Sequence, residues 1–111
     1  MMSVIENIER QIAENPILLY MKGSPNLPSC GFSAKAAKAI SACGEHFSYI
    51  DILQYPDIRA TLPKYANWPT FPQLWIDGQL VGGCDIILEM FYEGELQLLI
   101  KQTAQKYKTL K

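Results

Sequence analysis

Cys30-Gly31-Phe32-Ser33 is the most informative stretch of this chain of 111 residues. It places a cysteine at the start of a predicted helix and a serine three residues later. In a C-x-x-C turn the first thiolate attacks a disulfide, and the second cysteine resolves the resulting mixed disulfide. Because a serine hydroxyl cannot form a disulfide, that two-cysteine cycle is excluded. The pattern leaves one thiolate at Cys30, which can hold a mixed disulfide or ligate a soft metal.

The segments next to this stretch predict a strand, a loop and a helix. Residues 17–21 form a continuous apolar run that begins with a β-branched side chain, as is typical of a strand buried on both faces. Residues 22–29 hold two prolines, a glycine, two serines and an asparagine, and predict a loop. Ser29 is expected to cap a helix over 30–43. Cys30 therefore falls at a helix N-terminus.

The segments farther out predict two more helices and a second strand. A capping-box pattern over 3–6 predicts a first helix that ends at Asn15-Pro16. Residues 47–52 alternate and predict a second strand. Pro56 suits the first position of a third helix, and Pro63 is expected to kink or split that helix.

The last third of the chain predicts a hairpin followed by two helices. Residues 71–76 and 79–81 are expected to be its strands, joined by a turn at Asp77-Gly78. Helices are expected over 84–94 and from Glu95 to about Lys106.

The predicted order of elements is α-β-α-β-α-β-β-α-α. The β-α-β half requires parallel strands joined by a right-handed crossover, and the hairpin adds antiparallel strands. We therefore expect an α/β fold in which a four-stranded mixed sheet is flanked by helices. Residues 1–111 suit one domain, with a flexible tail at about 108–111.

Composition and charge exclude several classes of function. The net charge of −1 gives no reason to expect a nucleic-acid partner, and no apolar run approaches the ~18 residues of a membrane span. The first residues have no basic stretch followed by an apolar one, so we expect no signal peptide. The three cysteines, at positions 30, 43 and 84, argue against a disulfide framework and for the reducing cytoplasm. With His46 as the only histidine, one chain alone is a poor candidate for a closed four-ligand metal site.

Four motifs occur in an order and spacing that resemble one protein family. They are Met21-Lys22-Gly23, Cys30-Gly31-Phe32-Ser33, Trp68-Pro69-Thr70-Phe71-Pro72-Gln73 and Gly82-Gly83-Cys84-Asp85. Over nearly the whole chain the sequence resembles the bacterial single-domain monothiol glutaredoxins of the C-G-F-S type. The resemblance implies a thioredoxin fold, glutathione binding, and a [2Fe-2S] cluster shared between two protomers.

Cys30 is the candidate catalytic residue and metal ligand. At a helix N-terminus it experiences the positive end of the helix dipole and free backbone N–H groups, and Lys22 can add a positive charge. Both favour the thiolate, which is the nucleophile and the metal-binding form. The alternative is an inert structural cysteine, which is disfavoured because the polar, proline-rich loop before Cys30 favours exposure.

The Trp68–Gln73 motif is the second candidate element of the site. The resemblance implies that Pro72 is cis and faces Cys30, and that Thr70 and Phe71 contact glutathione. The unpaired amide and carbonyl of Phe71 would then pair with the extended tripeptide as an added strand does. The alternative is an ordinary trans proline that opens a strand.

The helix start at Gly83, Cys84 and Asp85 is the third candidate element. Its backbone N–H groups can bind a carboxylate, and Asp85 can cap the helix and accept the ammonium of a γ-glutamyl group. A plain N-cap aspartate is the alternative. By resemblance Arg59 pairs with the glycyl carboxylate, as Lys22 does. Phe32 completes the predicted set as a ligand contact. Lys64 is, like Arg59, a surface cation on the third helix, and its role stays open.

The remaining side chains with possible chemistry are read mainly as structural. The Cys84 thiol is either a slow distal resolving group or a half-buried packing residue. Cys43 lies on the apolar stripe of its helix and is expected in the core, and His46 is expected at the surface. Packing roles, buried or half-buried, are expected for three aromatic residues: Trp75, Phe91 and Tyr92.

Three functions remain open. A [2Fe-2S] cluster needs four soft ligands, which two copies of Cys30 and two glutathiones would supply. By resemblance such a carrier works with BolA-like proteins and iron-sulfur apoproteins. The second possibility is a glutathione-dependent thiol-disulfide oxidoreductase that removes glutathione from proteins with Cys30 alone. The third is an interaction module without catalysis. By resemblance, the eight-residue loop 22–29 is longer than expected in a dithiol relative, which favours the cluster carrier.

Overall fold

The computed structural model describes residues 1–109 and has the predicted order of elements. Its helices and strands are α1 (Val4–Glu14), β1 (Ile17–Met21), α2 (Gly31–Ala42), β2 (Ser48–Asp51), α3 (Pro56–Ala66), β3 (Gln73–Ile76), β4 (Gln79–Gly82), α4 (Cys84–Tyr92) and α5 (Glu95–Thr109). Helix α5 extends three residues beyond the expected end, so positions 108 and 109 of the expected tail are helical. Positions 110–111 of that tail lie outside the described residues.

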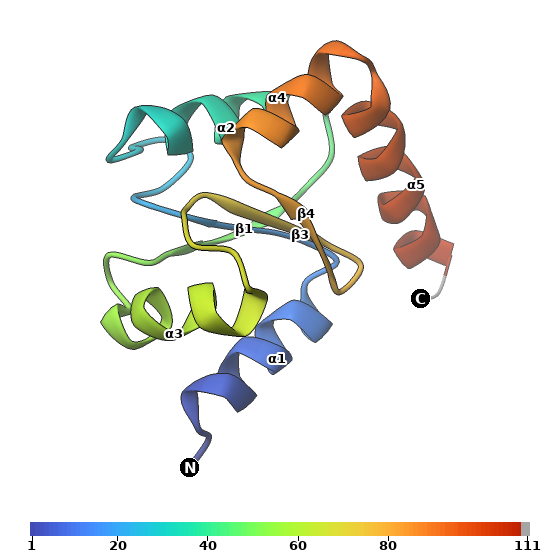
Figure 1. Cartoon of the computed structure of the whole chain (residues 1–111). Helices are drawn as coiled ribbons and strands as arrows, with labels where there is room; N and C mark the ends of the chain where they lie inside the picture. Colours follow the sequence, from blue (N-terminus) through green and yellow to red (C-terminus); the bar gives the residue numbers. More distant parts are fainter. Residues whose placement is uncertain (110–111) are drawn as a thin grey trace.

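The four strands form one mixed sheet in the order β2-β1-β3-β4. Strands β1 and β2 are parallel, whereas β1–β3 and β3–β4 are antiparallel, as the crossover and the hairpin predict. Figure 1 shows α1 and α3 on one side of the sheet and α2 and α4 on the other, with α5 following α4. The expected sheet between helices is confirmed.

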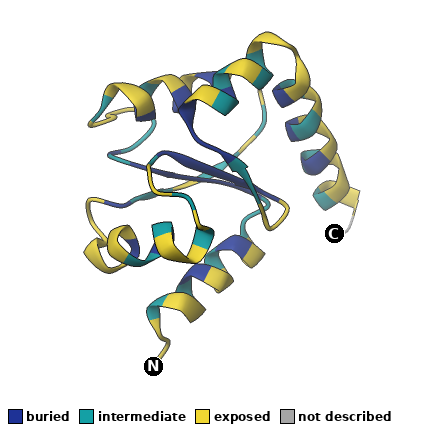
Figure 2. Cartoon of the chain, viewed as in Figure 1, coloured by how far each residue is buried: buried dark blue, intermediate teal, exposed yellow. Residues whose placement is uncertain are grey.

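The central strand β1 separates two hydrophobic clusters. Side chains of Ile17, Leu19 and Met21 join the cluster formed with α2, α4 and α5, and Leu18 and Tyr20 join the cluster formed with α1 and α3. All five are buried, because helices cover both faces of the strand. Figure 2 shows the same pattern for the whole chain, with burial concentrated on the strands and the inner faces of the helices.

Two local features depart from the sequence-based expectations. Strand β3 begins at Gln73 instead of Phe71, because the cis Phe71–Pro72 bond turns the chain before the strand. Helix α3 continues through Pro63 without a break. Pro63 lacks the N–H that would bond the carbonyl four residues earlier, and at the helix end the Trp68 N–H donates to the Pro63 carbonyl at 3.0 Å.

The hairpin and the end of α5 are joined by side chains. Asp77 and Gly78 have φ of 52° and 80°, as a tight two-residue hairpin turn requires. The Asp77 carboxylate accepts from Lys106 Nζ at 2.7 Å and from the Tyr107 hydroxyl. Lys108 adds an ion pair with Glu45. None of the helices within residues 1–109 has both the length and the apolar character to cross a membrane.

Candidate thiol site and ligand groove

Cys30 is itself the N-cap of α2, which corrects the expectation that Ser29 would cap this helix. Its backbone is extended, with φ −152° and ψ 155°, and its sulfur accepts the Ser33 N–H at 3.3 Å. Ser29 has another role, because its N–H donates to the Lys22 carbonyl at 2.9 Å and closes the preceding loop. The sulfur thus replaces the oxygen of an ordinary N-cap side chain.

Ser33 is fully buried and connects the thiol to the end of β1. Its hydroxyl oxygen accepts the Lys22 N–H at 3.1 Å and lies 3.3 Å from Cys30 Sγ. A hydroxyl has one proton and two acceptor lone pairs. With the Lys22 N–H on a lone pair, the hydroxyl proton is available to the thiolate. The sequence identified Ser33 only as a missing thiol, but the structure shows it as a hydrogen-bond partner of the sulfur.

The surroundings lower the pKa of Cys30. Partial burial by itself raises the pKa of this thiol. Hydrogen bonds from the Ser33 side chain and from the Ser33 and Phe32 backbone N–H groups outweigh the burial, and the positive charge of Lys22 adds to them. The helix start and Lys22 therefore both lower the pKa of Cys30 and favour its thiolate, as the sequence predicts.

A groove of about 690 Å³ lies beside the start of α2. It is lined by nine of the ten predicted ligand residues, namely Lys22, Phe32, Arg59, Thr70, Phe71, Pro72, Gly83, Cys84 and Asp85. Cys30 is not among the lining residues. It lies two positions before Phe32, whose exposed side chain does line the groove. Lys64 is also not among them. The predicted side chains come from five separate segments, and folding brings them to one place.

The groove also contains residues that the sequence did not predict as site residues. Trp68 and Pro69 belong to a motif that was recognised, and this is the signal by which they could have been found. Pro63 and Ile86 carry no such signal, since only the positions of α3 and α4 bring them to the groove.

The Phe71–Pro72 bond is cis, as the family resemblance implies. Among residues 1–109, the backbone N–H and C=O of Phe71 take part in no hydrogen bond. The buried Gln73 side chain holds the loop in place. Its Nε2 donates to the carbonyls of Trp68 and Thr70 at 3.1 and 3.3 Å, and its Oε1 accepts from Trp75 Nε1 at 3.2 Å. Phe71 therefore offers a free donor and acceptor on a fixed wall.

Gly83 is the N-cap of α4, and Asp85 makes no capping hydrogen bond, which corrects the expectation that Asp85 caps this helix. The chain enters the helix one residue before Cys84, so Asp85 lies in the first turn with an exposed carboxylate. A Cβ at Gly83 would lie 3.3 Å from both the Pro72 carbonyl oxygen and Trp68 Nε1. Glycine thus permits close contact between the helix start and the cis-proline loop.

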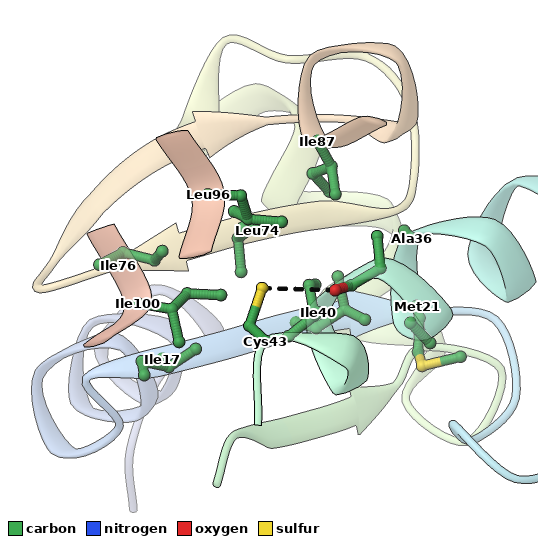
Figure 3. Close-up of a cluster of buried hydrophobic side chains, with 13 residues drawn as sticks. Ile17, Met21, Ala36, Ile40, Cys43, Leu74, Ile76, Ile87, Leu96 and Ile100 are labelled. Carbon is green, nitrogen blue, oxygen red and sulfur yellow. Dashed lines mark hydrogen bonds between the residues drawn. The ribbon is translucent and has the colours of Figure 1, made fainter. Parts of the chain in front are cut away.

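The other two cysteines are buried. Burial is the main cause that raises the pKa of Cys84, and the nearby Asp85 carboxylate raises it further. Cys84 is therefore held as a thiol, in agreement with a packing role. Burial also raises the pKa of Cys43. Its sulfur points into the hydrophobic cluster formed by β1 with α2, α4 and α5, and donates to the Ala39 carbonyl at 3.4 Å (Figure 3). Its expected core position is confirmed.

The other structural expectations have mixed outcomes. His46 is exposed, as expected. Trp75 is buried and Phe91 is half-buried, also as expected. The expectation for Tyr92 is wrong: 79% of this residue is exposed, and it is the last residue of α4.

A mixed sheet between helices, a cysteine at the start of α2 and a cis-proline before β3 define a thiol protein of the thioredoxin fold. The glutaredoxin family model matches residues 17–81. The chain is 75% identical over 109 residues to Glutaredoxin 4 of Escherichia coli strain K12, covering 98% of this chain and 95% of that protein. Glutaredoxin 4 of Pasteurella multocida is 67% identical, with 96% and 97% covered. The chain belongs to the glutaredoxin family.

Solved structures agree with this assignment. The solution structure of reduced poplar apo GrxS14 matches with a TM-score of 0.77 at 35% identity. The match covers 91% of this chain and 93% of the poplar chain.

Proposed function

We propose that this chain binds glutathione in the groove and carries a [2Fe-2S] cluster between two protomers, acting in iron-sulfur cluster biogenesis and transfer. BolA-like proteins and iron-sulfur apoproteins are the proposed partners. The observation that carries the proposal is the state of Cys30. Of the three cysteines it alone is not buried, its pKa is lowered, and Ser33 takes the place of a resolving thiol.

The supply of ligands explains why two chains and glutathione would act together. Such a cluster is held by four soft ligands, usually thiolates. In the described part of the chain no group of three or more histidine, cysteine or acidic side chains is placed to hold a metal. One Cys30 from each protomer and one glutathione thiolate from each groove would complete the set. Because half of these ligands are external, the cluster would be released readily to an acceptor.

The groove has the chemical features that glutathione requires. Its volume lies within the roughly 300–1,000 Å³ of small-molecule sites. Lys22 and Arg59 are cations for the glycyl carboxylate, and neither forms an ion pair within residues 1–109. Phe71 offers its backbone to the extended tripeptide. The N-terminus of α4 suits the γ-glutamyl carboxylate, and Asp85 suits the adjacent ammonium.

Reconstitution with iron and sulfide, with and without glutathione, tests the proposal. We expect visible absorbance and the mass of a dimer only when glutathione is present. Cys30→Ser should abolish both signals, whereas Cys43→Ser should keep them, because Cys43 faces the core. A colourless monomer under both conditions would favour a plain interaction module, and colour that survives in Cys30→Ser would refute the ligand assignment.

A second function is favoured by the lowered pKa of the same thiol. The Cys30 thiolate would attack the glutathione sulfur of a mixed disulfide and release the protein thiol. A second glutathione thiolate would attack the Cys30-bound glutathione and leave as glutathione disulfide, regenerating the thiolate. Turnover on a small mixed disulfide measures this activity. Rates equal to those of a dithiol glutaredoxin, measured in parallel, would make this oxidoreductase the primary function.

A further inference from the structure

The loop Lys22–Ser29 is a narrow closed turn held by its own backbone. Ser24 and Leu27 exchange backbone hydrogen bonds of 3.2 and 3.1 Å across its tip. At its base the Ser29 N–H donates to the Lys22 carbonyl at 2.9 Å. These bonds close the loop on itself, so its place beside the groove depends on what holds its base.

Two side chains from outside the loop hold its first two residues. Ser33 accepts the Lys22 N–H, and Asp51 Oδ1 accepts the Gly23 N–H at 2.9 Å. Asp51 is the last residue of β2, 28 positions from Gly23 along the chain. The same oxygen also accepts the Leu53 N–H at 3.0 Å. One carboxylate oxygen thus joins the loop to the end of the parallel strand.

The backbone at Gly23 leaves little room for another arrangement. Gly23 is buried with φ of +86°, and a Cβ there would lie 2.5 Å from the Leu27 carbonyl oxygen. Its N–H points to a single acceptor, Asp51 Oδ1. Because a buried N–H without a partner is costly, loss of that oxygen would favour displacement of the loop base.

Asp51 does not line the groove. It lines a second cavity of about 730 Å³, together with Gly23 and Ser29, whereas Lys22 lines the groove. The loop therefore contributes to both cavities, and Asp51 acts on the groove only through it.

We propose that Asp51 is a positioning residue for the thiol site. By holding Gly23 it fixes the Lys22 ammonium in the groove, and through the Lys22 N–H it keeps Ser33 in place to hydrogen-bond the Cys30 sulfur. The part of the proposal that concerns glutathione rests on the proposed function. The part that concerns the thiol does not, because the reactivity of Cys30 is measured without glutathione.

Three substitutions of one residue separate positioning from other roles. Asp51→Ala removes the acceptor and leaves two N–H groups without it. Asp51→Asn keeps an Oδ1 that accepts both N–H groups but removes the charge. Asp51→Glu keeps the charge but moves the acceptor by one methylene. The readout is the rate of Cys30 alkylation by iodoacetamide from about pH 5 to 9, with the modified cysteine identified by mass spectrometry.

Positioning predicts that the pH midpoint of alkylation rises in Asp51→Ala and Asp51→Glu but not in Asp51→Asn. At neutral pH the rate in Asp51→Ala should fall about threefold or more, since the thiolate loses hydrogen-bond and charge support. A direct charge effect predicts the opposite sign, because removing a nearby anion lowers the midpoint in Asp51→Ala and Asp51→Asn alike. Either that pattern or an unchanged midpoint in Asp51→Ala and Asp51→Glu would overturn the proposal.

Asp77→Ala is the matched control, because it removes an aspartate that also accepts two hydrogen bonds, at the hairpin. We expect it to lower the unfolding temperature without moving the alkylation midpoint. Glutathione binding, measured by calorimetry, should weaken about three- to tenfold in Asp51→Ala and stay unchanged in Asp77→Ala. If wild-type protein binds no glutathione, the proposed function fails, while the alkylation comparison still decides the role of Asp51. If Asp51→Ala does not fold, the alkylation midpoints of Asp51→Glu and Asp51→Asn are compared instead. A higher midpoint in Asp51→Glu than in Asp51→Asn supports positioning, and equal midpoints overturn it.

Discussion

Ser33→Ala tests whether the residue in place of the second cysteine supports the thiol. The substitution removes one buried hydroxyl, which accepts from the Lys22 N–H and lies against Cys30 Sγ. Alanine favours a helix more than serine does, so a loss of stability cannot come from helix propensity. Any destabilisation must come from the lost hydrogen bonds.

The magnitude follows from what the lost hydroxyl leaves behind. A buried N–H without an acceptor costs about 1–3 kcal/mol. Because Lys22 is only half-buried, water can replace part of the lost bond, so we expect the lower end, about 1 kcal/mol. In a domain of this size that loss lowers the melting temperature by about 4 °C. In addition the pKa of Cys30 should rise, since one donor to the thiolate is gone.

Two measurements on the same variant check both effects. Urea unfolding reports the free energy of unfolding, and the pH dependence of Cys30 alkylation reports the thiol. Ser41→Ala is the matched control, since Ser41 is exposed on the same helix and its hydroxyl makes no hydrogen bond within residues 1–109. If Ser33→Ala matches Ser41→Ala in both unfolding free energy and alkylation profile, the reasoning is refuted.

Two further predictions concern the hairpin and the helix start at the groove. Lys106 and Tyr107 lower the pKa of Asp77, so the contact stabilises the protein above the ordinary aspartate pKa of about 4, and this contribution is lost as the pH falls through the lowered value. Asp77→Asn should therefore cost at most about 1 kcal/mol at neutral pH and nothing in strong acid; an equal loss in urea unfolding at both pH values contradicts this. Gly83→Ala places a Cβ 3.3 Å from the Pro72 carbonyl oxygen and Trp68 Nε1, so the groove wall must shift and glutathione affinity in calorimetry should fall about tenfold. Unchanged affinity in that variant would show that the wall adapts.

Several elements were predictable because their signals are local. The capping box at Ser3 and Glu6 is present with both hydrogen bonds, at 3.1 Å each. The Asp77-Gly78 turn has the positive φ values that its sequence favours. The apolar run of β1 is buried throughout. The capping box and the turn are made by residues close together in the chain, so their local pattern contains the information. The burial of β1 comes from helices packed on both faces, but its continuous apolar run already signals that a strand there must be covered.

Other features depended on neighbours that the local pattern does not contain. Pro63 was expected to kink or split α3; the helix is not split, and the Trp68 N–H donates to the Pro63 carbonyl at its end. The cis bond at Pro72 followed only from the family resemblance, and it sets where β3 begins. The capping role of Cys30 depends on the orientation of a backbone that Ser29 and Lys22 hold.

The sequence by itself determined the kind of chemistry: one cysteine at a helix start, a serine that cannot resolve a disulfide, and the motifs of a glutaredoxin. Only the tertiary structure decided which groups meet at that cysteine. The bond between Asp51 and Gly23 spans 28 positions, and the burial of Cys43 and Cys84 depends on helices packed over the sheet. Such contacts depend on strand register and helix packing, which arise when distant segments are brought together, and a local pattern of residues does not contain them.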